Sequence, residues 1–181
     1  MTKTLLRWLT LAAVLPAVAG CSWIDKKKEQ PPCPRVSVLA DSARMVRFKP
    51  GPGRDISDVE LSANFSDFKG SCLYDWDKKV MSVNLQIVID AQRGPAAQGR
   101  KSELSYFVAI PAFFPSDKAK VVMPVSLEFP DTTDRVRYGD KEVSLNIPIP
   151  RIKELAAYEV FIGLQLTEDQ VEYNRNAKGR F

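Results

Sequence analysis

Cysteine is the most reactive residue type in this chain, at positions 21, 33 and 72, and histidine is absent. Without histidine, the chain lacks the Ser-His-Asp and Cys-His arrangements of hydrolases and the usual imidazole-bound zinc and copper sites. Paired carboxylates or a Ser-Lys dyad could still catalyse a reaction, but neither has a recognisable motif here. The sequence therefore predicts a protein that is not an enzyme and that holds no cofactor and no metal.

The residues before Cys21 have the features of a cleaved export signal. Lys3 and Arg7 are the only charges in the first 20 residues, and the apolar run Leu9–Ala19 follows them. That run is shorter than the ~20 residues that a membrane-spanning helix needs. With Val18-Ala19-Gly20 before the cysteine, the segment resembles a bacterial lipoprotein signal with its lipobox. Ordinary secretion would also fit the small residues, but it requires no cysteine after them.

The lipoprotein resemblance implies an address for the protein. In such lipoproteins residues 1–20 are removed, the thiol equivalent to Cys21 receives a diacylglyceryl group, and the new amine is acylated, commonly with palmitate. Two or three acyl chains anchor a protein stably, since each buried CH₂ contributes about 0.8 kcal/mol. Ser22 after the cysteine implies sorting to the outer membrane, facing the periplasm. The chain as a whole resembles small lipoproteins of Gram-negative envelopes, with residues 21–32 as a lipidated tether.

A disulfide is predicted between the two remaining cysteines, Cys33 and Cys72. An even number of thiols in an oxidising compartment favours a bridge. A pair of buried thiols or a redox couple is the alternative, but there is no Cys-x-x-Cys spacing and no flanking cluster of positive charge to support reactivity.

The charge balance argues against nucleic acid as a partner. Lys3 and Arg7 belong to the signal, so the rest of the chain has only two more basic than acidic side chains. Part of this small excess lies in Lys26-Lys27-Lys28, beside Cys21. These lysines fit a solvated tether, or attraction to anionic headgroups.

Period-two alternation dominates residues 33–167 and predicts one all-β domain. Alternation of this kind is typical of antiparallel strands with one buried face. The strand-like runs are 36–40, 59–66, 83–91, 104–114, 121–129, 143–149 and 158–166. About seven or eight short strands separated by turn residues favour an antiparallel β-sandwich. Pro111, Pro124 and Pro148 lie inside strand-like runs, so they predict sheet edges, bulges or strand ends.

One corner of this body resembles immunoglobulin-like and fibronectin type III domains. The segment 149–160 is similar to the corner before their penultimate strand, where a tyrosine hydroxyl bonds back to upstream backbone. The resemblance implies that role for Tyr158, with Leu155 beside it. A core tyrosine is the alternative interpretation.

Basic residues surround the Pro-Gly loop at 50–53. Such a loop can present amides and cationic side chains to phosphate or carboxylate, which predicts an anion-binding or partner-binding site. The alternative is that these side chains cap the turn and pair with neighbours such as Asp41 and Asp55. The candidate residues are Arg44, Arg47, Lys49 and Arg54.

An uncharged run at 107–115 is the candidate apolar patch, through Ile110, Phe113 and Phe114. It could hold a lipid tail or seat a partner. The alternative is a central strand buried on both faces.

Two further segments have modest expected roles. The aspartates at 75, 77, 131 and 134 lie in predicted turns and are interpreted as turn formers, because a calcium site needs a fuller set of oxygen ligands. Residues 168–181 form a polar C-terminal tail, expected to be flexible or docked on a partner.

The sequence thus predicts a non-enzymatic accessory or scaffold module in an envelope protein complex, held at the outer membrane through Cys21. A lipid-binding or glycolipid-binding and transfer protein is the alternative function. The identity of the partner protein and the oligomeric state do not follow from the sequence.

Overall fold

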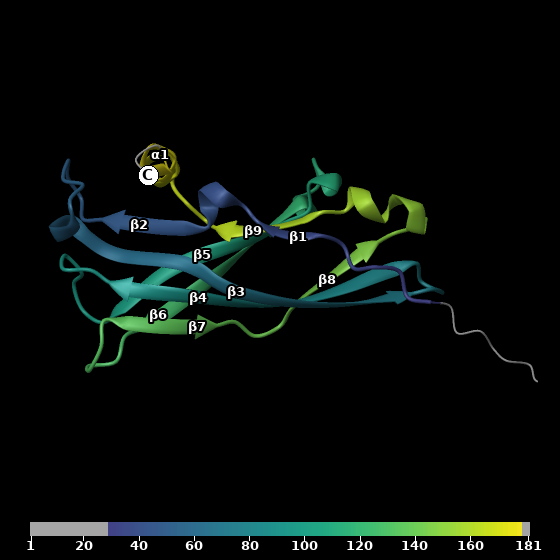
Figure 1. Ribbon diagram of the computed structural model, residues 1–181, viewed down its shortest axis with the longest axis horizontal. Coiled ribbons are helices and arrows are strands. Elements are labelled where there is room, and N and C mark those ends of the chain that lie inside the picture. The colour runs from purple at the N-terminus through teal and green to yellow at the C-terminus, as the bar shows by residue number, and fades with distance from the viewer. Residues whose placement is uncertain (1–28, 179–181) are drawn as a thin grey trace, which may run out of the picture.

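Two β-sheets packed face to face form the protein (Figure 1). The structure is a computed structural model and describes residues 29–178. The predictions for the signal at 1–20, for Cys21 and for most of the tether fall outside these residues. Within them there are nine strands and a single α-helix, so the predicted all-β sandwich is confirmed.

The elements follow one another along an elongated molecule. The strands are β1 (Val36–Val38), β2 (Arg44–Phe48), β3 (Val59–Asp75), β4 (Val80–Arg93), β5 (Lys101–Ala109), β6 (Lys120–Glu128), β7 (Arg135–Gly139), β8 (Val143–Pro148) and β9 (Val160–Leu164). Five short 3₁₀ turns connect them, η1 (Ala40–Ser42), η2 (Ile56–Asp58), η3 (Pro111–Phe113), η4 (Asp117–Ala119) and η5 (Ile152–Ala157), and α1 (Glu168–Lys178) follows β9.

Strand order is β1-β9-β5-β6 in one sheet and β2-β3-β4-β7 in the other. β8 also pairs with β4, so β7 and β8 share one edge of that strand, at residues 88–92 and 80–85. β1 pairs with β9 in parallel, and the chain then crosses to the opposite sheet to form β2. The remaining pairings are antiparallel.

Large apolar side chains fill the space between the sheets. Alternate residues of each strand point inward because successive side chains of a strand face opposite sides. Tyr106 is the largest of the fully buried residues, and the same core contains fully buried apolar side chains from both sheets. These include Leu61, Met81, Leu85, Ile87, Ile89, Ile147, Ile149, Ile162 and Leu164.

β3 and β4 form one long hairpin that runs the length of the molecule. The predicted turn after β3 is confirmed, because the Asp75 carboxylate accepts the backbone N–H groups of Asp77 and Lys78 at 3.0 and 2.9 Å. At the next residue, Lys79, φ is +55°. These bonds hold the pKa of Asp75 below its usual value, chiefly through the Lys78 N–H.

β3 extends well beyond the strand predicted at 59–66. Its register against β4 shifts between Phe65 and Asp67, which places one extra residue in β3. Such a bulge inverts which residues face the core. Consequently Leu61, Ala63 and Phe65 are followed on the inner face by even-numbered positions such as Phe68 and Tyr74. The alternation read along the sequence stops at the bulge, although the strand continues to Asp75.

The prolines within strand-like runs lie where they were predicted. Pro124 lies in β6 and Pro148 ends β8, both of which are sheet-edge strands, and Pro111 follows the end of β5. The corner tyrosine is different. The Tyr158 ring packs edge-on against Phe113, with centroids 5.8 Å apart, and within residues 29–178 its hydroxyl has no hydrogen bond. A different tyrosine, Tyr74, makes a buried hydrogen bond to distant backbone, from its hydroxyl to the Ile149 carbonyl at 2.9 Å.

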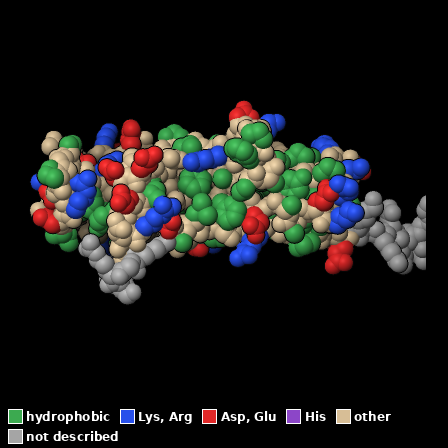
Figure 2. All heavy atoms as spheres, turned by 90° about the horizontal axis from the view of Figure 1, so that it is seen from above, with side chains coloured by type: hydrophobic (Ala, Val, Ile, Leu, Met, Phe, Trp, Pro, Cys, Tyr) green, Lys and Arg blue, Asp and Glu red, His purple; other side chains and the backbone are tan. Residues whose placement is uncertain are grey.

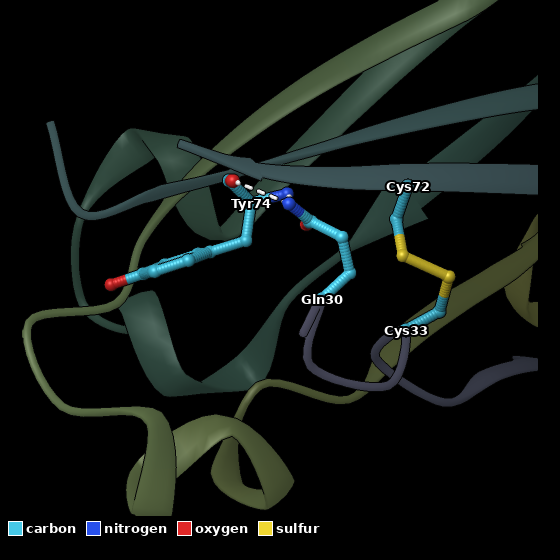
Figure 3. Close-up of a disulfide and its surroundings, with 4 residues drawn as sticks. All are labelled: Gln30, Cys33, Cys72 and Tyr74. Carbon is cyan, nitrogen blue, oxygen red and sulfur yellow. Dashed lines mark hydrogen bonds between the residues drawn. A yellow bond between two sulfur atoms is a disulfide. The ribbon is translucent and has the colours of Figure 1, made fainter. Parts of the chain in front are cut away.

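The first described residues are tied to the end of the long hairpin (Figure 3). Cys33 and Cys72 form the predicted disulfide, with Sγ atoms 2.02 Å apart and Cα atoms 5.7 Å apart. Beside it, the Gln30 side chain accepts the Tyr74 N–H at 2.9 Å and donates to the Tyr74 carbonyl at 3.4 Å. Here this end of the molecule is called the Cys33 end.

The polar segment 168–181, predicted to be flexible or docked on a partner, differs from that prediction over residues 168–178. Glu168–Lys178 is an α-helix that packs on β2 and η1 of its own domain. Asn174 is 1% exposed, and its side-chain amide donates to the carbonyls of Asp41 and Arg44 at 2.9 and 2.8 Å. The segment is polar, so its sequence has no apolar face that predicts packing. Its attachment to the domain depends on residues about 130 positions earlier.

Seen from above, hydrophobic side chains are most continuous along the middle of the molecule, where some charged side chains lie among them, and further charged side chains lie at both ends (Figure 2). The loops at 50–54, 94–100 and 130–134 lie at the end opposite to the Cys33 end (Figure 1). Here this is called the loop end.

Candidate functional site

A groove of about 410 Å³ lies at the loop end between β2, the Pro-Gly loop and α1. β2 contributes Val46–Lys49, and the loop contributes Pro50, Gly51 and Arg54. The far wall consists of Thr167, Asp169, Gln170 and Tyr173. The Phe48 and Tyr173 rings meet edge-on across it, with centroids 5.2 Å apart.

The loop wall is held by its own backbone. Gly51 has φ +129°, a conformation that residues with a Cβ rarely adopt, so glycine is required there. The Arg54 guanidinium donates to the carbonyls of Gly51 and Gly53 at 2.8 and 2.7 Å and lies 5.4 Å from the centre of the Phe48 ring. Arg54 thus braces the loop and supplies a cation to the groove.

Lys49 and Asp58 form the shortest ion pair of this wall, at 2.7 Å. The hydrogen bond from Lys49 holds the pKa of Asp58 below its usual value, with help from the Asp55 N–H, and the pKa of Lys49 is raised in return. Asp55 and Asp58 cap η2 reciprocally. A Cβ on Gly53 would collide with the Asp58 carboxylate, so the loop packs tightly against this pair.

The structure brings together three of the four predicted basic residues. Arg47, Lys49 and Arg54 line the groove, whereas Arg44 is exposed at the start of β2 and does not line it. Arg47 lies 3.6 Å from Glu60 and reaches the opposite sheet, where it donates to the Glu103 carbonyl at 2.9 Å. Lys49 thus pairs with Asp58 and Arg47 with Glu60. Of the acidic neighbours suggested by the sequence, Asp55 caps η2 and Asp41 pairs with Arg175.

The helical wall of the groove was not predicted from the sequence. Thr167, Gln170 and Tyr173 belong to a segment that was expected to be a tail. The signal that could have found it is the N-cap: the Thr167 hydroxyl accepts the Gln170 N–H at 3.4 Å, and the Gln170 side chain accepts the Thr167 N–H at 3.0 Å. This Thr-x-x-Gln pattern is a capping box.

The predicted apolar patch separates into three environments. Ile110 is 4% exposed and belongs to the core, and Phe113 is half-buried against Tyr158. Phe114 alone is open, at 81% exposure. Val121 and Val122 of β6 are each about half exposed. Of the three residues predicted for the patch, only Phe114 is therefore an open apolar side chain.

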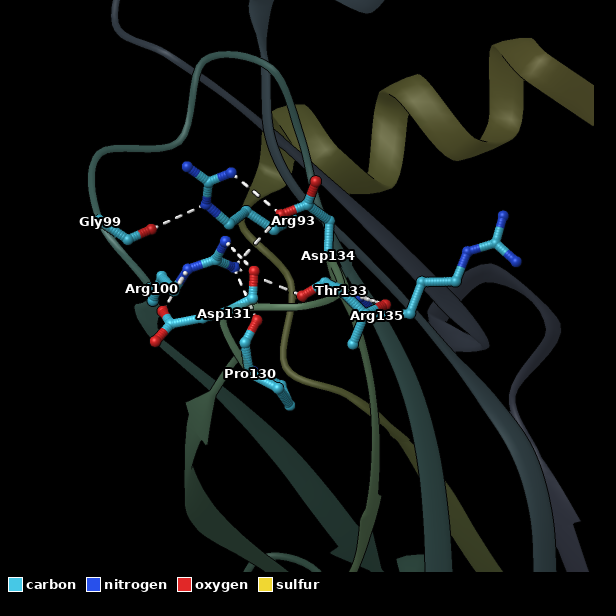
Figure 4. Close-up of polar contacts among 8 residues, drawn as sticks. All are labelled: Arg93, Gly99, Arg100, Pro130, Asp131, Thr133, Asp134 and Arg135. Atoms are coloured by element: carbon cyan, nitrogen blue, oxygen red, sulfur yellow. Dashed lines mark hydrogen bonds and ion pairs between the residues drawn. The ribbon is translucent and has the colours of Figure 1, made fainter.

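Arginine–aspartate contacts join the other two loops of the loop end (Figure 4). Arg93 and Arg100 both reach Asp134, at 3.1 and 3.5 Å, and Arg100 also pairs with Asp131 at 3.0 Å. Arg100 donates in addition to the carbonyls of Pro130 and Asp131. Asp131 and Asp134 thus lie in a loop and pair with arginines. Residues 29–178 contain no group of three or more acidic or cysteine side chains placed to hold a metal ion.

One polar contact crosses the core between the sheets. The buried Tyr106 hydroxyl donates to the Asp140 carboxylate, which also accepts from the Tyr138 hydroxyl at 3.1 Å. Burial, and then the adjacent carboxylate, raise the pKa of both tyrosines, so each stays protonated and able to donate. Asp140 therefore has a structural role, because its carboxylate accepts the hydrogen bond of the buried Tyr106 hydroxyl.

No protein-family model, curated protein or solved structure matches the chain. Among residues 29–178, no helix has the length and apolar character needed to cross a membrane. The candidate site is therefore defined by its own geometry, as an open groove with a basic loop wall, an aromatic floor and a helical wall.

Proposed function

We propose that the protein is a non-enzymatic accessory or scaffold module of an envelope protein complex, anchored to the outer membrane through Cys21 and facing the periplasm. The observation that carries the proposal is the opposite placement of the tether and the groove. Gln30 and Cys33 are fastened at one end of the β3–β4 hairpin, and the groove lies at the other end (Figure 1).

The lengths involved support this arrangement. Seven residues lie between Cys21 and Glu29, the first described residue, and the eight Cα-to-Cα steps reach at most ~29 Å. The 17 residues of β3 extend for about 55 Å. An anchor at Cys21 therefore keeps the Cys33 end close to the membrane and leaves the groove within reach of a periplasmic partner.

The filled interior supports a binding surface in preference to an internal carrier site. Tyr106 and the aliphatic side chains around it are fully buried between the sheets. Protein interiors packed in this way have no space for an acyl chain. Contacts with other molecules are thus expected on the outside, at the groove and the loops.

A photo-crosslinking experiment tests the proposal in cells that produce the full chain. A benzophenone amino acid replaces one exposed residue at a time, at the loop end (Pro50 or Gln98), and at the Cys33 end (Leu73). We expect a reproducible protein adduct from the loop-end positions and less from Leu73. If no position yields an adduct with an envelope protein, the accessory function is wrong.

A second candidate function, lipid or glycolipid binding, is supported by the open side chain of Phe114 in the segment 107–115. A large apolar side chain left in solvent can contribute to a binding surface. Organic extraction of the purified protein and a vesicle-transfer assay test this function. The Phe114→Ser variant should then lose lipid, whereas Ile56→Ser, which changes an equally exposed residue at the loop end, should retain it.

A further inference from the structure

The five strands that lie at sheet edges differ in how open they are to another chain. An unpaired strand edge offers its N–H and C=O groups for β-sheet extension unless proline, charge or a covering element blocks it. β6 contains Pro124, β8 ends in Pro148, and β1 has only three residues. β2 and β7 remain as edges without proline, and the groove borders β2.

Hydrogen bonds at both ends of β2 show which of its backbone groups face outward. The Ala43 carbonyl accepts the Phe65 N–H at 2.9 Å, and the Lys49 N–H donates to the Asp58 carbonyl at 2.8 Å. Odd-numbered residues therefore face β3, and alternation directs the N–H and C=O groups of Arg44, Val46 and Phe48 to the free edge.

α1 covers one end of this free edge. The Asn174 amide donates to the Arg44 carbonyl, as the peptide group of a neighbouring strand would. Its Oδ1 is buried and has no hydrogen bond to residues 29–178, although an unpaired buried acceptor costs about 1–3 kcal/mol. Asn174 thus occupies the outward-facing carbonyl of Arg44, while Val46 and Phe48 line the groove.

Charge defines the occupant of the open part. The groove lining includes the cations Arg47, Lys49 and Arg54 and a single carboxylate, Asp169. Arg47 and Lys49 have acidic partners, but Arg54 bonds only to carbonyl oxygens and makes no ion pair within the described residues. A carboxylate placed beside the Pro-Gly loop would form an ion pair with Arg54.

We propose that the free edge of β2 is a strand-addition site for a short extended segment of the partner protein, with a carboxylate of that segment beside Arg54. This inference rests on the proposed accessory function and names its docking mode. The backbone groups of Val46 and Phe48 bind the segment, Asn174 limits it at one end, and the basic loop selects its charge. A side-chain carboxylate and a C-terminal carboxylate satisfy the same site.

Val46→Pro is the variant that tests strand addition. Proline removes the N–H of residue 46, which faces the free edge, so the β2–β3 ladder keeps its bonds. Val46→Thr is the matched control, because it keeps the N–H and the β-branched shape. Arg54→Gln tests the carboxylate. Thermal unfolding of each purified variant shows whether the domain remains folded.

The readout is the adduct formed in cells by a benzophenone amino acid at position 50, with the crosslinked peptide sequenced by mass spectrometry. We expect Val46→Pro to reduce the adduct at least about tenfold and Arg54→Gln about fivefold, while Val46→Thr retains it. An internal crosslinked segment with Asp or Glu identifies a side-chain carboxylate, and a C-terminal segment identifies the terminal one.

Several outcomes would overturn strand addition. They are an unchanged adduct in a folded Val46→Pro variant, a crosslinked segment without any carboxylate, and adducts at position 98 with none at position 50. Each of these leaves the accessory function standing. Loss of protein adducts at all tested positions would instead remove the accessory function itself.

Discussion

The two ends of the sandwich are held together by different kinds of interaction. At the Cys33 end, a disulfide and the buried Tyr74–Ile149 hydrogen bond join segments that are 39 and 75 residues apart. At the loop end, Arg93 and Arg100 bind Asp131 and Asp134, which are exposed to solvent. The first set is covalent or shielded from water, and the second competes with water and salt.

This difference matches the roles proposed for the two ends. The tethered end must hold the domain at a fixed place relative to its anchor. Stable contacts such as a disulfide and a buried hydrogen bond serve that purpose. Exposed ion pairs contribute little, typically below 1 kcal/mol each, and can rearrange when a partner binds. The following changes test the contrast, from the largest expected effect to the smallest.

Replacing both cysteines, Cys33→Ser with Cys72→Ser, should have the largest effect. A bridge over 39 residues lowers the entropy of the unfolded chain, so its loss should reduce the free energy of unfolding by about 4 kcal/mol. Urea unfolding of the oxidised protein and the double variant measures this. A change below about 1 kcal/mol would show that the disulfide does not dominate the Cys33 end.

Tyr74→Phe should reduce the free energy of unfolding by about 2 kcal/mol. The substitution removes the hydroxyl and leaves the Ile149 carbonyl buried without its donor. Tyr158→Phe is the matched control, since its hydroxyl has no hydrogen bond within the described residues, and its effect should be below about 0.5 kcal/mol. Equal losses in the two variants would contradict the assignment.

Asp134→Asn should reduce the free energy of unfolding by less, about 1 kcal/mol or below, and this reduction should depend on the salt concentration. It weakens the contacts with Arg93 and Arg100 while preserving side-chain shape. Urea unfolding at low NaCl and at 1 M NaCl should show the cost shrinking, because salt screens exposed charges. A loss that persists unchanged at 1 M NaCl would mean that these contacts are shielded as at the Cys33 end.

Asp58→Asn should change the free energy of unfolding by the smallest amount of these variants, and that change should depend on pH. Lys49 holds the pKa of Asp58 below its usual 3.8, so the stabilisation is present above pH 3.8 and disappears as the pH falls through the lowered value. The stability difference between the parent and the variant, followed by urea unfolding as the pH falls from 6 to 2, should therefore shrink towards zero. A difference that grows on acidification would contradict the ion pair.

Local pattern sufficed for several elements and failed at identifiable places. The alternation of Val83, Leu85 and Ile87 indicated β4 because inner and outer positions repeat regularly there. β2 was missed since Arg44 and Arg47 interrupt its apolar character, and Arg47 reaches the opposite sheet rather than solvent. The second half of β3 was missed because a bulge after Phe65 inverts the alternation.

The candidate site was predicted in part, for the same reason. Arg47, Lys49 and Arg54 are close in sequence, so the Pro-Gly loop brings them together whatever the rest of the fold does. The capping box of Thr167 and Gln170 could have indicated the helix, but not its place in the groove wall, because Thr167 and Tyr173 reach the groove only after β9 has returned the chain to that end.

The sequence alone determined the sandwich, the Cys33–Cys72 pairing and the basic character of the 50–54 loop. All three depend on local alternation, on the number of cysteines or on neighbouring residues. Tertiary structure decided which cation has which partner, and it placed Asn174 on a strand edge 130 residues away. It also left Val46 facing an open groove, since an edge exists only after the other strands have paired.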